Sequence, residues 1–127
     1  MHINHIACWT QDLDRLVDFY TRYFGAEVQP LYQNKARKFT SRFLVFPGGS
    51  RLEIMNRPDI LPRSTDEPHV GYIHVAFSVG SKETVDHLTK QLQADGFPPI
   101  DGPRWTGDGY YESTILDPDG NRVEITL

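Results

Sequence analysis

Two histidines and two glutamates have matching surroundings in the two halves of this 127-residue sequence. His5 and His74 begin the segments His-Ile-Ala and His-Val-Ala, while Glu53 and Glu124 lie within Leu-Glu-Ile and Val-Glu-Ile. The histidines are 69 residues apart and the glutamates 71, so nearly one offset relates both pairs, as an internal duplication requires. Imidazole nitrogens and carboxylate oxygens bind divalent metals. We therefore predict one metal site with His5, Glu53, His74 and Glu124 as ligands.

The charges of these side chains also favour a bound cation. Two carboxylates that converge in a cleft repel each other and take up a proton unless a cation lies between them. Two neutral imidazoles, two carboxylates and a divalent ion sum to zero charge. A ligand set of nitrogen and oxygen without thiolate suits zinc, nickel, cobalt, manganese or iron, and an octahedral ion keeps positions open for water or substrate. Open positions predict a catalytic rather than a structural metal.

Each of the four residues has a simpler explanation when it is considered alone. A single histidine in a strand is usually a hydrogen-bonded structural residue, and a single glutamate between aliphatic residues usually lies on the solvated side of a strand. Neither explanation gives a reason for the same residue type to recur at matching points of a duplicated module. A metal on a pseudo-twofold axis does need one histidine and one glutamate from each module, so the recurrence favours the metal site.

The elements that position the first pair are predicted by the spacing of apolar residues. A strand at 3–9 precedes a helix that Thr10 or Asp12 can cap and that Gly25 can end. Three more strands are expected in the first half, at 26–32, 39–46 and 51–56.

The second half repeats this order of elements. A strand at 71–79 precedes a helix that Ser81 can cap and Gly96 can end. Three strands complete it, at 97–101, 109–116 and 121–127.

Strand geometry then predicts where the four ligands point. Neighbouring side chains in a strand face opposite sides of the sheet, so each ligand lies on the face away from its aliphatic neighbours. Between the two halves, residues 57–70 contain three prolines and several charges without periodicity, which indicates a linker. We predict a single α+β domain of two tandem βαβββ modules, residues 1–56 and 71–127, which form a cupped mixed sheet around the metal.

Composition excludes several other classes of function. The chain is large enough for one compact domain, with 39% hydrophobic residues. Its formal net charge of -4 and lack of a basic stripe argue against nucleic acid as a partner. No stretch approaches the roughly 20 apolar residues of a membrane helix, and no basic-then-apolar leader is present. We therefore expect no membrane partner and a cytoplasmic location.

The sequence resembles the vicinal oxygen chelate superfamily, and within it the small glyoxalase-I-like proteins. The resemblance covers essentially the whole chain, from Asn4-His5-Ile6-Ala7 and the predicted first helix to the segment Asp-Pro-Asp-Gly-Asn-Arg-Val-Glu-Ile at 117–125. In bacterial glyoxalase I, a histidine and a glutamate from each module hold the metal, and these match the four residues singled out above.

This resemblance implies a lyase or isomerase that transfers a proton on a small-molecule substrate, which chelates the metal through two adjacent oxygens. It also implies a homodimer, in which the metal site is formed within one chain or shared between two. Glu124 would be the principal base, and Glu53 would have a secondary role.

Other members of the superfamily leave alternatives open. They include epimerases, ring-cleaving dioxygenases, thiol transferases and proteins that only sequester drugs. Dioxygenases and thiol transferases typically use two histidines and one glutamate, so a fourth ligand at Glu53 argues against both. The residues that hold the glutathione tail in glyoxalases have no match here. Arg37, Lys38 and Arg104 could bind an anionic substrate, but exposed basic residues in strand edges and loops are common, so we do not assign them this role. The alternatives are a metal-containing small-molecule binding protein without turnover, or an epimerase or dioxygenase of the superfamily.

Overall fold

The computed structural model describes residues 1–62 and 70–127, and the chain divides into two compact units, Met1–Thr65 and Asp66–Leu127. Each unit contains one helix and the strands around it. Residues 57–62 form no helix or strand. Residues 63–69 of the predicted linker lie outside the described part of the chain.

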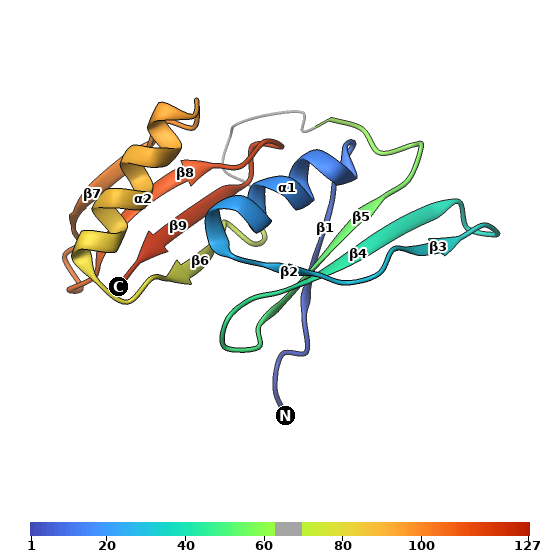
Figure 1. The fold of residues 1–127 in the computed structure, drawn as a ribbon, viewed down its shortest axis with the longest axis horizontal. Helices are drawn as coiled ribbons and strands as arrows, with labels where there is room; N and C mark the ends of the chain where they lie inside the picture. The colour runs from blue at the N-terminus through green and yellow to red at the C-terminus, as the bar shows by residue number, and fades with distance from the viewer. Residues whose placement is uncertain (63–69) are drawn as a thin grey trace. The chain divides into compact units, whose positions relative to one another are not determined.

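Unit one is a mixed sheet with one helix (Figure 1). Its sheet has the order β1-β5-β4-β2, β3 also pairs with β4, and β1 runs parallel to β5 while the other pairs are antiparallel. The elements are β1 (Ile6–Trp9), α1 (Leu13–Phe24), β2 (Glu27–Val28), β3 (Tyr32–Asn34), β4 (Phe39–Val45) and β5 (Arg51–Asn56).

Two boundaries in unit one differ from the prediction. The strand predicted at 26–32 is split into β2 and β3, because Pro30 lies between them and has no backbone N–H to donate to a ladder. The first strand begins at Ile6 rather than at residue 3. His5 therefore directly precedes β1.

Helix α1 covers one face of this sheet and contacts β4 and β5. Asp12 caps its start by accepting a hydrogen bond from the Arg15 backbone, and Gly25 ends it with a φ of 65°. The core between helix and sheet consists of fully or nearly fully buried side chains, among them Leu16, Phe19, Tyr20, Leu44 and Ile54. Because Leu44 and Ile54 lie on the face under the helix, the residues next to them in β4 and β5 lie on the other face.

Unit two has the same plan, with the sheet order β6-β9-β8-β7 and β6 parallel to β9 (Figure 1). The strand predicted at 97–101 is wrong, because Pro98 and Pro99 cannot donate to a ladder and the strand begins only at Asp101. The elements are β6 (His74–Ser78), α2 (Lys82–Ala94), β7 (Asp101–Trp105), β8 (Tyr111–Leu116) and β9 (Arg122–Thr126).

Helix α2 packs on β7, β8 and β9 through an apolar face. Ser81 caps it as predicted, and Gly96 adopts a φ of 95° just after its C-cap, Asp95. A buried hydroxyl pair also joins helix to sheet: Thr89 donates to the carbonyl of its own helix at Val85, and its oxygen also lies within hydrogen-bond distance of the Ser113 hydroxyl. The fully buried aliphatic residues of this core are Val85, Leu92, Ile115, Val123 and Ile125.

No helix in the described part of the chain is both long and apolar enough to cross a membrane.

A bulge in β7 brings two backbones unusually close. Asp101 pairs with Thr114 and Arg104 with Glu112, so β7 has one more residue than β8 between these pairs. Gly102, at a φ of 75°, occupies this bulge, and a Cβ there would lie 2.4 Å from the Glu112 carbonyl oxygen and 2.9 Å from the Ser113 Cα. Only glycine fits this position without moving β8.

Gly102→Ala should therefore destabilise the protein strongly. We expect a loss of about 2–4 kcal/mol in the free energy of unfolding, from the clash with β8 and from the positive φ. Urea denaturation measures this. The control is Gly107→Ala, since a Cβ at Gly107 meets no atom within 4 Å, and its expected effect is within about 0.5 kcal/mol. Equal stability of the two variants would contradict the close approach.

Candidate metal centre

In unit one, the parallel pairing of β1 with β5 brings His5 beside Glu53. Ala7 is the register partner of Glu53, and His5 lies two residues before Ala7 on the same side of the strand. The Nε2 atom of His5 is 3.6 Å from Oε2 of Glu53. Both side chains point away from the face that α1 covers, as the sequence predicted.

One ring nitrogen of His5 has a neighbour other than Glu53. Nδ1 lies 2.8 Å from Oδ1 of Asn4, so a proton on Nδ1 would be donated to that oxygen and would leave Nε2 available to bind a metal ion. Phe43, the register partner of Glu53 on β4, meets the imidazole edge to face at a centroid distance of 5.1 Å and holds the ring in place.

Unit two repeats this arrangement. Ala76 is the register partner of Glu124 in the parallel pair of β6 and β9, and His74 again lies two residues before that alanine. The Nδ1 atom of His74 is 3.0 Å from Oε1 of Glu124. Each unit therefore forms one histidine–glutamate pair by the same register.

The geometry of each pair fits half of a metal site. Two donors that bind one ion at roughly 2.1 Å lie about 3.0–3.4 Å apart for octahedral to tetrahedral angles, close to the 3.0 and 3.6 Å found here. The two histidine side chains are 36% and 35% exposed, and the two glutamates only 15% and 18%. The carboxylates are thus largely removed from water while the imidazoles stay open to a ligand.

The full set of four ligands stays a prediction. Within residues 1–62 and 70–127, no three His, Cys, Asp or Glu side chains form a cluster that could hold a metal ion. The structure brings together His5 with Glu53 and His74 with Glu124, each pair inside its own unit.

Another acidic residue lies next to the second pair and was not predicted from the sequence as part of the site. Glu112 on β8 lies two residues from Thr114, the register partner of Glu124, so Glu112 and Glu124 are diagonal neighbours on one face. Burial and the negative charge of Glu124 raise the pKa of the Glu112 carboxyl. The alternation of buried Tyr111, Ser113 and Ile115 with less buried Glu112 was a usable signal, but only the β8–β9 register reveals its neighbour.

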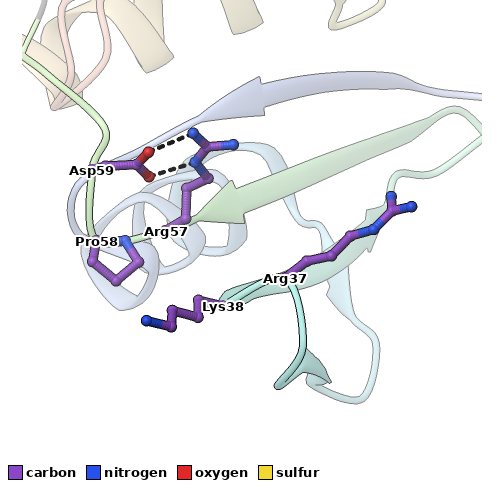
Figure 2. Close-up of a pocket in the computed structure, with 5 residues that line it drawn as sticks. All are labelled: Arg37, Lys38, Arg57, Pro58 and Asp59. Carbon is purple, nitrogen blue, oxygen red and sulfur yellow. Dashed lines mark hydrogen bonds and ion pairs between the residues drawn. The ribbon is translucent and has the colours of Figure 1, made fainter.

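The three basic residues considered as ligands of an anionic substrate lie in two different places. Arg104 forms a two-point ion pair with Asp101. Arg37 and Lys38 line a hollow of about 430 Å³ in unit one together with Arg57, Pro58 and Asp59 (Figure 2). In that hollow Arg57 is paired with Asp59 and lowers the pKa of its carboxyl, while the side chain of Arg37 extends away from this pair.

The fold agrees with what is found in known proteins. The family model of the Glyoxalase/Bleomycin resistance protein/Dioxygenase superfamily matches residues 2–125. The chain therefore belongs to this superfamily, as its resemblance to vicinal oxygen chelate proteins predicted.

Two relatives show how broad the family is. The chain is 27% identical over 128 residues to an uncharacterized protein of Pseudomonas aeruginosa, with 98% of this chain and 86% of that protein covered. It is 24% identical over 148 residues to glyoxalase I of Saccharomyces cerevisiae, and the match covers 97% of this chain but only 44% of the yeast protein.

Solved structures share the fold. A glyoxalase family protein from Enterococcus faecalis has a TM-score of 0.82 at 21% identity, with 99% of this chain and 97% of that chain covered. The fosfomycin resistance protein FosX from Listeria monocytogenes, solved with Mn(II) and sulfate, has a TM-score of 0.73 at 21% identity, with 99% and 91% covered. At these identities the similarity establishes the fold alone.

Proposed function

We propose that this protein is a metal-dependent lyase or isomerase of the glyoxalase I type. Its reaction would move a proton between adjacent carbons of a small substrate that chelates the metal through two neighbouring oxygens. The observation that carries this proposal is the repetition of one histidine–glutamate pair in both units, by the same strand register and beside the same alanine. Membership in a superfamily that includes glyoxalase I supports the choice of reaction.

His5, Glu53, His74 and Glu124 would hold one divalent ion, which we expect to be zinc, nickel, cobalt, manganese or iron. Mn(II) in the FosX structure shows that this fold accommodates such an ion in another protein. When bound, the ion supplies Lewis-acid chemistry, because it withdraws electron density from the substrate oxygens and so acidifies the C–H bond next to the carbonyl.

The chain's own contribution is a base that removes and returns the proton. A carboxylate accepts the proton as the C–H bond breaks, and the protonated carboxyl then delivers it to the neighbouring carbon. We assign this role to Glu124, because similarity to glyoxalase I places the principal base in the second module. Glu53 occupies the equivalent position in unit one, where we expect a secondary role.

We also propose a homodimer, because modules of this kind close their sheets against a partner module. A site shared between two chains would combine the first pair of one chain with the second pair of the other.

Metal content is the first measurement that tests this proposal. Purified protein should contain about one divalent ion per chain, since two largely covered carboxylates that converge without a cation between them are costly. His74→Ala should release most of the ion, and Asn4→Ala should weaken binding by about tenfold because it frees the ring of His5. The control is His87→Ala, since His87 is exposed on α2. If elemental analysis finds equal metal in His74→Ala and His87→Ala, the pairs are ordinary ion pairs.

The role of Glu124 is tested by hydrogen exchange with solvent. Metal-loaded protein in deuterium oxide should introduce deuterium next to the carbonyl of small α-hydroxycarbonyl compounds, supplied with and without a thiol and followed by NMR. Glu124→Gln can still bind metal through its amide oxygen but cannot accept a proton, so we expect the rate to fall about 10²–10⁴-fold with metal retained. Glu53→Gln should be less affected. Binding of these compounds without any exchange would instead indicate a protein that sequesters its ligand.

Mixed dimers test the assembly. If sites are shared, a dimer of one Glu53→Ala chain and one Glu124→Ala chain keeps one complete site and loses both glutamates from the other. The isolated mixed dimer should then show about half of the wild-type activity, because one of its two sites is complete, whereas sites within one chain predict no recovery. A monomer in sedimentation at micromolar concentration would exclude the dimer.

A further inference from the structure

The duplication preserves the ligands but not the residues next to them. Residues that are register partners across neighbouring strands form a row on one face of the sheet. The row that contains the glutamate begins with Ala7 in unit one and with Ala76 in unit two. A metal at the centre of two equivalent modules needs such identical donors. A substrate without twofold symmetry needs different contacts from the two modules, so residues that recognise it should be those that the duplication has changed.

The next row along the strands has changed completely. In unit one it consists of Trp9, Met55 and Ser41, which are register partners across β1, β5 and β4. In unit two the corresponding residues of β6, β9 and β8 are Ser78, Thr126 and Glu112. The aromatic Trp9 and the apolar Met55 of one module thus correspond to polar residues in the other, and Ser41 corresponds to the acidic Glu112.

Glu112 is the residue of this row that calls for a ligand. Its side chain is half-buried, and no hydrogen bond or ion pair to its carboxylate is found within residues 1–62 and 70–127. Arg104 and His74 attract the carboxylate electrostatically, but burial and the charge of Glu124 outweigh them and raise its pKa. Arg104, its register partner on β7, is held instead by both carboxylate oxygens of Asp101. A half-buried carboxylate without a partner is unfavourable until a hydrogen-bond donor reaches it.

The position of Glu112 sets the distance at which such a donor must lie. Diagonal neighbours on one face of an antiparallel pair are roughly 7–8 Å apart, within reach of long side chains. A group that hydrogen-bonds to Glu112 while the rest of the molecule lies beside Glu124 must therefore be a few bonds away from the chelating oxygens.

We propose that Glu112 determines substrate specificity, by accepting a hydrogen bond from a hydroxyl or ammonium group that the substrate carries a few bonds beyond its two chelating oxygens. This inference rests on the proposed metal site. It adds the substrate class: small chelating compounds with a terminal donor group, rather than compounds that end in a methyl group.

Three hydroxamates of one length test this proposal, since a hydroxamate chelates a metal through two adjacent oxygens and does not undergo the reaction. Butanohydroxamate ends in a methyl, 3-hydroxypropanohydroxamate in a hydroxyl and 3-aminopropanohydroxamate in an ammonium group. Calorimetry with zinc-loaded protein should show at least one of the donor compounds binding about 10- to 100-fold more tightly than the methyl compound. The preferred terminal group distinguishes a hydroxyl-bearing from an ammonium-bearing substrate.

Variants at Glu112 should remove this preference selectively. Glu112→Gln should lose the preference for an ammonium group, and Glu112→Leu that for either donor, while both bind the methyl compound as wild type does. Thermal melting checks that each variant is folded. If one variant fails to fold, the other still tests the proposal. Glu83→Gln is the control, because Glu83 is exposed in the first turn of α2, and it should keep the wild-type preference.

The possible failures are distinguishable. If no hydroxamate binds in a zinc-dependent manner, the metal site is wrong and the role of Glu112 falls with it. If all three bind wild type equally, or if both Glu112 variants keep the preference, the role of Glu112 is overturned while the metal site stands.

Discussion

The parallel pairing of the first and last strands in each module is the constraint on which the candidate site depends. In both units this pairing sets an alanine opposite the glutamate, and the histidine two residues earlier then lies beside the carboxylate. Because side chains alternate between faces, a slip of one residue would turn Glu53 or Glu124 into the core under the helix. The aliphatic neighbours of each glutamate, which are buried in that core, make such a slip costly.

The two faces of each sheet therefore have different roles: one packs against the helix and the other holds the polar pairs. Helices α1 and α2 cover the face that holds Leu44, Ile54, Val123 and Ile125, and this packing fixes the sheet without using any ligand residue. The opposite face is free to hold polar pairs, whose burial is unfavourable unless a cation compensates the charge. A rigid apolar layer behind a polar face gives the precise spacing that a metal site needs.

Duplication explains both the similarity and the difference between the modules. Residues that would bind a shared, centrally placed ion are under the same geometric requirement in both units and are identical. The row beside them is free of that requirement, and Trp9 and Met55 in one unit correspond to Ser78 and Thr126 in the other.

The sequence by itself determined the modular order, the caps at Asp12, Ser81 and Gly25, and the face on which each of the four predicted metal ligands lies, because these depend on local spacing. Local patterns could not place the strand after Pro98 and Pro99, where missing backbone donors outweigh the turn and strand signals. The tertiary structure decided the cross-strand register, which alone brings His5 to Glu53, His74 to Glu124 and Glu112 to its diagonal neighbour. Register depends on pairing between residues more than 40 positions apart for each histidine–glutamate pair, and no local pattern in the sequence encodes such a distance.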